Sequence, residues 1–175
     1  DVSFLRRARK HVLGRIPDGE IRDALLLTVN EGGRSISAEA LDEAVGVIDG
    51  FPYMMQLVGY RMWAENPCSE QIALADARHG IELAKREMIE GILEYTYREL
   101  SDGDKRFLAA MLPDSQDSSL AAISRRMGVK SNYASQYKRR LLAQGVIGEY
   151  SKGYVRFDMP VFRDYLEQRL KEEQE

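Results

Sequence analysis

The residues in this sequence best suited to chemistry are those that can read the edges of bases. Asn132, Gln136 and Arg139 follow one another at the spacing of one face of an α-helix. An arginine can form two hydrogen bonds with guanine, and asparagine or glutamine can form two with adenine. These three side chains form one outward stripe if the apolar residues between them are buried, so the segment is predicted to enter a groove of DNA. The apolar residues expected to be buried are Ala134, Tyr137 and Leu141.

Neighbouring side chains extend this candidate DNA-reading stripe. Tyr133 and Arg140 flank it, and Lys130, Ser131 and Lys152 are placed to hold phosphates. If about five phosphates are neutralised, the logarithm of the affinity should fall with the logarithm of the salt concentration at a slope of roughly −4 to −5.

The net charge of the chain hides two regions of opposite sign. The whole chain carries −3, but residues 118–157 contain eight basic residues and one acidic residue, Glu149, which gives +7. The remaining residues therefore sum to −10. Only residues 118–157 suit a polyanion. The same charges also fit a basic helix exposed to solvent, or one that docks on an acidic protein surface.

Catalytic and metal sites find no support in the sequence. A loop that binds nucleotide phosphates ends in Lys-Ser or Lys-Thr after glycine, and no glycine here is followed by Lys. No predicted strand ends in the paired acids that hold magnesium, so the chain alone is expected neither to hydrolyse ATP nor to bind a cofactor. His11 and His79 lie far from any Gly-x-Ser-x-Gly motif. One cysteine, Cys68, and two histidines are too few for a disulfide or a Cys/His zinc site.

The candidate DNA-reading residues must lie on a helix. The second half of the sequence predicts such a helix within a series of four helices and two β-rich segments. Ser101 and Asp104 have the spacing of a capping box, which starts a first helix. Two further helices, 120–127 and 131–144, are joined by Gly-Val-Lys-Ser, and Ser131 is predicted to cap the second of them. The later elements are β-rich segments at 146–150 and 154–157, a turn at Ser151-Lys152-Gly153, and a helix from Pro160 with Val161, Phe162, Tyr165 and Leu166 facing inward. This order predicts a winged helix-turn-helix domain whose wing is a small β-hairpin.

The first half of the sequence is predicted to be a bundle of helices. A first helix ends at Gly32-Gly33, Ser37 caps a second helix that ends near Gly50, and Pro52 opens a third. The apolar face of the third helix is taken as Met55, Val58, Gly59, Met62 and Trp63. A long fourth helix of about six turns follows. Its apolar face is predicted to be Ala77, Ile81, Ala84, Met88, Ile92 and Tyr95.

We therefore predict a mainly α fold in two parts. Residues 1–99 form the helical bundle, with the long helix as a bridge, and residues 100–175 form the winged-helix domain. No apolar run approaches the roughly 18 residues of a membrane helix, so no membrane contact is expected. The first residues lack an apolar signal region and a Met. We interpret this start as a cut in a longer protein, and the single cysteine fits a reducing, cytoplasmic setting.

Several stretches of the chain resemble the C-terminal portion of actinobacterial and archaeal ATP-binding proteins of the AAA+/STAND type. The resemblance covers residues 4–170 through the order and spacing of its motifs. The stretches that carry it are Phe4-Leu5-Arg6-Arg7-Ala8, Ile36-Ser37-x-x-Ala40-Leu41, Gly50-Phe51-Pro52-Tyr53-Met54-Met55-Gln56-Leu57 and Asp158-Met159-Pro160-Val161-Phe162.

This resemblance implies a helical AAA+ lid followed by a winged helix, and it implies a missing N-terminal ATPase core as partner and ATP or ADP as the parent protein's ligand. The Gly-x-Pro turn of the lid, Gly50, Pro52 and Tyr53 here, would sit over the nucleotide base, with Pro52 packed against it. The plain alternative is that Pro52 only starts a helix. Origin-recognition relatives place an arginine where Tyr53 stands, so the sequence departs from them towards the STAND-like switches.

Three functional hypotheses follow. The first is a non-catalytic regulatory module of an ATPase, in which the lid contacts nucleotide and the winged helix binds double-stranded DNA. The second is a protein-interaction or autoinhibitory module that packs on the ATPase core without nucleic acid. The third is a standalone transcriptional regulator.

Overall fold

The chain is mainly helical with a few short strands in the computed structural model, which describes residues 14–173. The stretch Phe4-Leu5-Arg6-Arg7-Ala8 and His11 lie outside the described residues. Within that range, no helix is long and apolar enough to cross a membrane.

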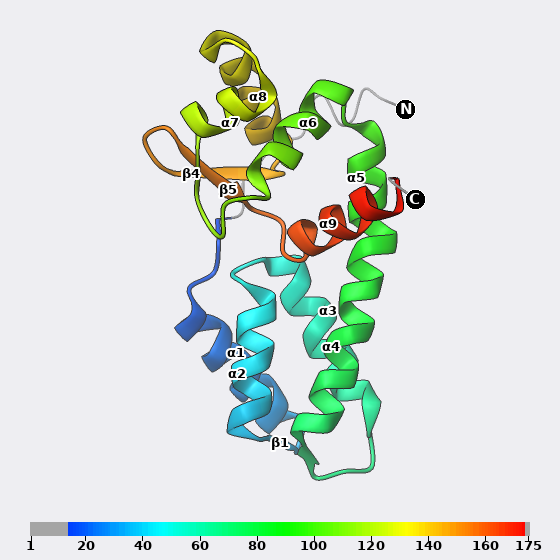
Figure 1. Cartoon of the computed structure of the whole chain (residues 1–175). Coiled ribbons are helices and arrows are strands. Elements are labelled where there is room, and N and C mark those ends of the chain that lie inside the picture. The colour runs from blue at the N-terminus through cyan, green and yellow to red at the C-terminus, as the bar shows by residue number, and fades with distance from the viewer. Residues whose placement is uncertain (1–13, 174–175) are drawn as a thin grey trace, which may run out of the picture.

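In the first half, two helices pack against the lower part of a long helix, and a third packs on those two (Figure 1). They are α1 (Asp18–Glu31), α2 (Ala38–Ile48) and α3 (Pro52–Glu65), and the long helix begins as α4 (Leu74–Met88). The predicted helix starts are confirmed because local chemistry sets them. The Ser37 side chain accepts a hydrogen bond from Ala40 N at 3.2 Å, and Pro52 stands in the first turn of α3, where its missing N–H costs nothing.

The predicted face of α3 is wrong in part. Val58 and Met62 are buried as expected, but the other buried residues are Met54 and Leu57, whereas Met55 is only half-buried. Gly59 and Trp63 are also only half-buried. Apolar residues occur on most sides of α3, so spacing alone does not fix which side packs inward.

Two features absent from the prediction close the far end of the bundle. Strands β1 (Ser35–Ile36) and β2 (Gln71–Ile72) pair in parallel. Beside them the buried Arg34 guanidinium donates to Trp63 O at 2.8 Å and Asn66 O at 2.9 Å, which satisfies carbonyl groups at the end of α3.

The long helix continues through a π-helical turn. It consists of α4, the π-turn η1 (Ile89–Leu93) and α5 (Glu94–Glu99). Up to Met88 the predicted buried positions are confirmed, but beyond it Leu93 and Tyr97 are buried, while Ile92 is half-buried and Tyr95 is 63% exposed. A π-turn holds an extra residue, so it shifts every later side chain relative to the regular α-helical pattern.

The second half combines three helices with a three-stranded sheet (Figure 1). The helices are α6 (Asp102–Met111), α7 (Leu120–Met127) and α8 (Ser131–Ala143), and the strands are β3 (Ser118–Ser119), β4 (Ile147–Ser151) and β5 (Tyr154–Phe157). The strand order is β3-β5-β4, and both pairs are antiparallel. The predicted hairpin is therefore present, and Ser101 caps α6 by accepting from Asp104 N at 3.3 Å. The short strand β3 was not predicted.

The last helix, α9 (Phe162–Glu172), returns to the long helix. Its buried residues are Phe162 and Leu166, and Tyr165 meets Tyr97 edge-on with ring centroids 5.9 Å apart. The predicted start at Pro160 is wrong, because Val161 has a left-handed backbone with φ of 65° and the helix begins only after it.

Candidate nucleic-acid interface

A tight turn sets the direction of α8. Gly128 ends α7 with φ of +67°, a left-handed conformation that glycine adopts without steric cost. Val129 N then donates to Ser124 O at 3.1 Å, and the Ser124 hydroxyl donates to Val129 O at 2.6 Å. These two bonds hold the α7–α8 connection, so the direction in which α8 leaves α7 is fixed by local contacts.

The buried side of α8 agrees with the sequence. Ala134 and Leu141 are fully buried, and Tyr137 is half-buried. On the opposite side, Asn132, Gln136 and Arg139 are exposed. The structure therefore places these three residue types, which suit base edges, on the open face of one helix.

The start of α8 differs from the prediction in one respect. Lys130, Ser131 and Tyr133 are all exposed there, but Lys130 is the N-cap residue and no side chain caps the helix. The predicted cap by Ser131 is wrong, because Ser131 is already inside the helix and its carbonyl accepts from the Ser135 hydroxyl at 2.8 Å. The first-turn N–H groups of α8 therefore do not donate to the Ser131 hydroxyl, and the Ser131 side chain is exposed.

The hairpin stands beside α8 and is connected to it by an ion pair. Lys138 Nζ on α8 donates to Glu149 Oε1 on β4 at 2.5 Å. Lys152 is exposed in the turn between the two strands, and Gly153 next to it has φ of +83°. The structure thus joins the turn that carries Lys152 to the helix that carries the stripe.

Arg140 differs from the other predicted contact residues because its guanidinium is bonded to other residues of the chain. It donates to Asp104 Oδ1 at 2.8 Å and to Ser101 Oγ at 3.3 Å, and it lies over the Tyr137 ring at 4.9 Å. The Asp104 side chain is only 4% exposed, so this pair attaches α8 to the start of α6. Sequence spacing could not show this, because the two partners are 36 residues apart.

Other basic residues of 118–157 are also engaged. Arg126 forms two hydrogen bonds of 2.6 Å with the carboxylate of Asp114, and the Arg126 guanidinium lowers the pKa of that carboxyl from 3.8 to about 2. Arg156 lies over the Tyr150 ring, 3.3 Å from its centroid. Of the basic residues in 118–157, those that are exposed and form no ion pair with the described residues 14–173 are Arg125, Lys130, Arg139 and Lys152. About four cations, rather than about five, are therefore available for phosphates or bases.

The Gly50-Phe51-Pro52 turn lies between α2 and α3. Gly50 is buried with φ of +74°, and its carbonyl accepts from Ile16 N at 2.9 Å. A Cβ at Gly50 would lie 3.0 Å from the Arg15 Cβ, so the close approach of this chain segment favours glycine. Pro52 is half-buried and Tyr53 is 41% exposed.

Arg15 connects this turn to the second half of the chain. Its guanidinium bonds the carbonyl and carboxylate of Asp49, the residue before Gly50, and also lies 3.3 Å from Asp158 Oδ1, just after β5. Tyr150 OH donates to the same Asp158 oxygen. One side chain therefore joins the α2–α3 turn to the hairpin.

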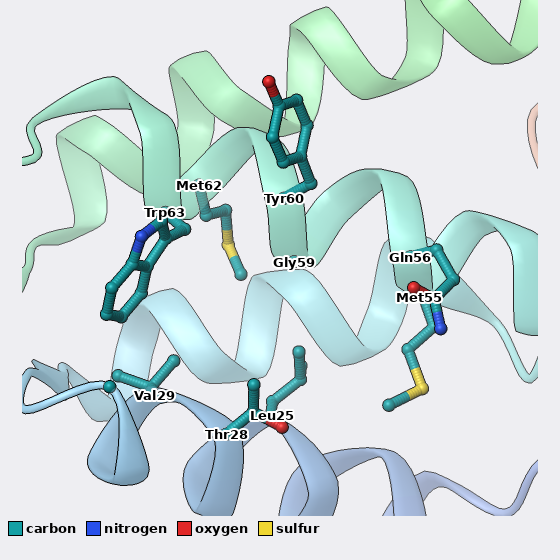
Figure 2. A pocket seen from close by; sticks show the side chains of 10 residues that line it. Leu25, Thr28, Val29, Met55, Gln56, Gly59, Tyr60, Met62 and Trp63 are labelled. Atoms are coloured by element: carbon teal, nitrogen blue, oxygen red, sulfur yellow. The ribbon is translucent and has the colours of Figure 1, made fainter.

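An apolar hollow of about 510 Å³ lies between α1 and α3. Figure 2 shows Leu25 and Val29 of α1 and Met62 and Trp63 of α3 around it. The hollow ends at Gly32, where an added Cβ would approach the Trp63 ring to 2.3 Å. No sequence pattern indicated this hollow, and none of the predicted site residues lines it.

Among residues 14–173, no group of three or more His, Cys, Asp or Glu side chains is placed to hold a metal ion.

Comparison with known proteins gives limited similarity. Residues 90–166 match a family described as a domain of unknown function (DUF8462). No curated protein matches the chain. The similar solved structures include the RuvB Holliday junction branch migration motor of Thermotoga maritima and two mutants of it, each at 15% identity, with 90% of this chain and 50% of that chain covered and a TM-score of 0.41. The chain thus spans about half the length of these structures, and a likeness at this level carries no argument about its function.

Proposed function

We propose that residues 100–175 form a winged-helix domain that binds double-stranded DNA through α8 and the β4–β5 hairpin. The observation that carries this proposal is the open face of α8. Asn132, Gln136 and Arg139 are exposed on it, and no ion pair engages Arg139 within residues 14–173. Elsewhere the protein satisfies many of its arginines internally, so an exposed arginine in line with two amides suits an external partner.

The proposed contacts divide into two kinds. Arg139, Asn132 and Gln136 would contact base edges in the major groove, where each base pair presents a distinct pattern of donors and acceptors. Lys130 at the start of α8 and Lys152 in the hairpin turn would contact phosphates, which position the helix but do not read sequence. In this scheme Arg140 acts within the protein by holding α8 on α6.

Binding to a labelled duplex of mixed sequence tests the proposal by fluorescence anisotropy at low salt. Arg139→Ala should weaken binding about five- to hundredfold, because a base contact by arginine contributes about 1–3 kcal/mol. Arg22→Ala is the matched control, since it removes one half-buried arginine that pairs with Asp42 in the first half of the chain. Lack of binding to any duplex, or equal losses in the two variants, would reject DNA as the partner.

We also propose that the chain is the lid and winged-helix region of a larger AAA+/STAND ATPase, divided near residues 99 and 100. Support comes from the motifs quoted from the sequence and from the buried glycine and helix-starting proline of the Gly50-Phe51-Pro52 turn. Pro52 and Tyr53 would face the nucleotide of a core that precedes this chain. The chain alone is expected not to hydrolyse ATP. A coding sequence upstream without a glycine-rich loop ending in Lys-Ser or Lys-Thr would contradict this proposal.

A protein-interaction role is the second candidate. The observation in its favour is that Arg126, Lys138 and Arg140 are already paired with carboxylates. This pairing lowers the positive electrostatic potential that would attract a polyanion. The basic face would then dock on an acidic protein surface, such as an ATPase core, and hold it inactive. The anisotropy titration separates the two candidates, because this role predicts no binding to any duplex.

A further inference from the structure

Glu149 is the one acidic residue in the basic stretch 118–157, and it lies beneath the turn of the hairpin. Its Oε1 atom accepts from Lys138 Nζ at 2.5 Å and from Gly153 N at 2.9 Å. One carboxylate oxygen therefore bonds both the side of α8 and the backbone next to Lys152. In a region proposed to bind a polyanion, an acid would ordinarily oppose binding.

A β-bulge directly follows Glu149 in β4. The register of β4 and β5 is regular at Ile147 and Gly148, and it becomes irregular between Glu149 and Ser151, where Tyr150 is the extra residue. Tyr150 stacks with Arg156 and donates to Asp158. Glu149 itself pairs in register with Val155, so strand alternation places its side chain on the same face as Ile147, where it bonds Lys138.

The bonds that Glu149 forms favour its ionised state. The hydrogen bonds from Lys138 and from Gly153 N hold the pKa of the Glu149 carboxyl below its usual value. Charge-assisted bonds of this kind are stronger than bonds between neutral groups. At neutral pH the carboxylate therefore keeps the hairpin turn attached to α8.

We propose that Glu149 is a positioning residue for DNA binding: by bonding Lys138 and Gly153 N it holds the hairpin turn so that Lys152 meets a phosphate while α8 occupies the groove. This inference rests on the proposed DNA-binding function. Charge alone predicts that removal of an acid strengthens binding to a polyanion. This inference predicts the opposite, namely that removal of Glu149 weakens it.

The test compares two variants that each remove one negative charge. Glu149→Gln should bind a mixed-sequence duplex about threefold or more weakly than the wild-type chain, because the phosphate contact of Lys152 is lost. Asp117→Asn is the matched control. Asp117 is exposed and forms no ion pair within residues 14–173, so this variant should bind as tightly as the wild-type chain or slightly more tightly.

A double-mutant cycle separates positioning from a general loss of structure. In a Lys152→Ala background there is no hairpin cation left to position, so Glu149→Gln should then leave the affinity unchanged or raise it. In the wild-type background, Glu149→Gln and Lys152→Ala should each reduce the magnitude of the salt slope by about one. A general loss of folded structure would lower the affinity by the same factor in both backgrounds.

The outcomes distinguish this inference from the proposed function. Equal or tighter binding by Glu149→Gln, or equal losses in both backgrounds of the cycle, would overturn the role of Glu149 while DNA binding stands. Absence of duplex binding by the wild-type chain would instead reject the proposed function, and this inference with it.

Discussion

At the scale of single residues, Asp114 connects helices of the second half through both its carboxylate and its backbone carbonyl. Both of its oxygens accept from Arg126 on α7 at 2.6 Å. Its backbone carbonyl accepts from Arg163 on α9 at 2.6 Å. The loop that follows α6 is therefore attached to two other helices, which explains why an exposed polar loop has a defined position.

The Asp114–Arg126 pair predicts a specific dependence of stability on pH. The pKa of Asp114 is about 2 in the folded chain, against an ordinary value of 3.8. Because the folded-state pKa is lowered, the stabilisation is fully present above about pH 4 and is lost as the pH falls from 3.8 towards 2. Urea unfolding of the wild-type chain should show this loss, and Asp114→Asn should show a smaller one over the same interval.

The control for this prediction lies in the same loop. Asp117→Asn should change the free energy of unfolding at pH 7 by less than about 0.5 kcal/mol, as expected for an exposed residue without an ion pair. An identical pH dependence of the free energy of unfolding in Asp114→Asn and the wild-type chain would show that the Asp114–Arg126 pair does not contribute to it.

Residue-scale features were predictable where the chemistry is local. The Ser37 and Ser101 caps and the turn at Gly128 depend on residues within three or four positions of one another. The pairs that engage Arg126 and Arg140 join residues 12 and 36 positions apart. No spacing rule connects such partners, so the sequence overestimated how many cations are available for DNA.

Two glycines in the long helix have opposite roles at the scale of elements. Gly80 is buried where α4 crosses α3, and an added Cβ would lie 2.7 Å from Met62 N. Gly91 is exposed in the π-turn, with no atom within 4 Å of an added Cβ. Close approach of two backbones therefore requires the first glycine and not the second.

Alanine substitution at each glycine should therefore shift stability in opposite directions. Gly91→Ala should raise the free energy of unfolding by about 0.5–1 kcal/mol, because alanine loses less conformational entropy on folding. Gly80→Ala should lower it by about 1–3 kcal/mol, because α3 and α4 must separate. Thermal and urea unfolding measure both changes, and stabilisation by Gly80→Ala would show that the helices are not in close contact.

Helix existence was predictable from the sequence, but helix phase was predictable only in part. The buried residues of α1, α2 and α4 recur every three or four positions, as apolar spacing predicts; in α1 they are Ile21, Leu25 and Val29. The π-turn at Ile89–Leu93 then exchanges Tyr95 for Tyr97 on the buried side, and packing rather than local pattern decides where such a turn forms. The two-residue strands β1, β2 and β3 carry too few residues to show an alternating pattern.

At the scale of the whole molecule, Arg15 joins the two halves. It bonds Asp49 beside the Gly50-Phe51-Pro52 turn and lies 3.3 Å from Asp158 Oδ1 beside the hairpin. The long helix provides the other connection, and α9 packs against it (Figure 1). Because the charged residues of this contact are far apart in sequence, it could not be predicted from spacing.

Loss of the Arg15 contact should loosen the orientation of the two halves. Cys68 is the one cysteine of the chain and is exposed, so a spin label there can be paired with one at Gln144→Cys. Arg15→Ala should broaden the measured distance distribution. Arg22→Ala, which removes a pair to Asp42 within the first half, should leave it unchanged. Identical distributions in Arg15→Ala and the unsubstituted labelled chain would show that Arg15 does not fix the orientation.

The dependence of duplex affinity on salt tests the central claim most directly, because it counts the phosphates that the exposed cations neutralise. With Lys130, Lys152 and the exposed Arg125 available for phosphates, the logarithm of the affinity should fall with the logarithm of the salt concentration at a slope of about −2 to −3. The slope should become shallower by about one in Lys152→Ala. A slope near zero, or no binding of duplex even at the lowest salt, would contradict the account.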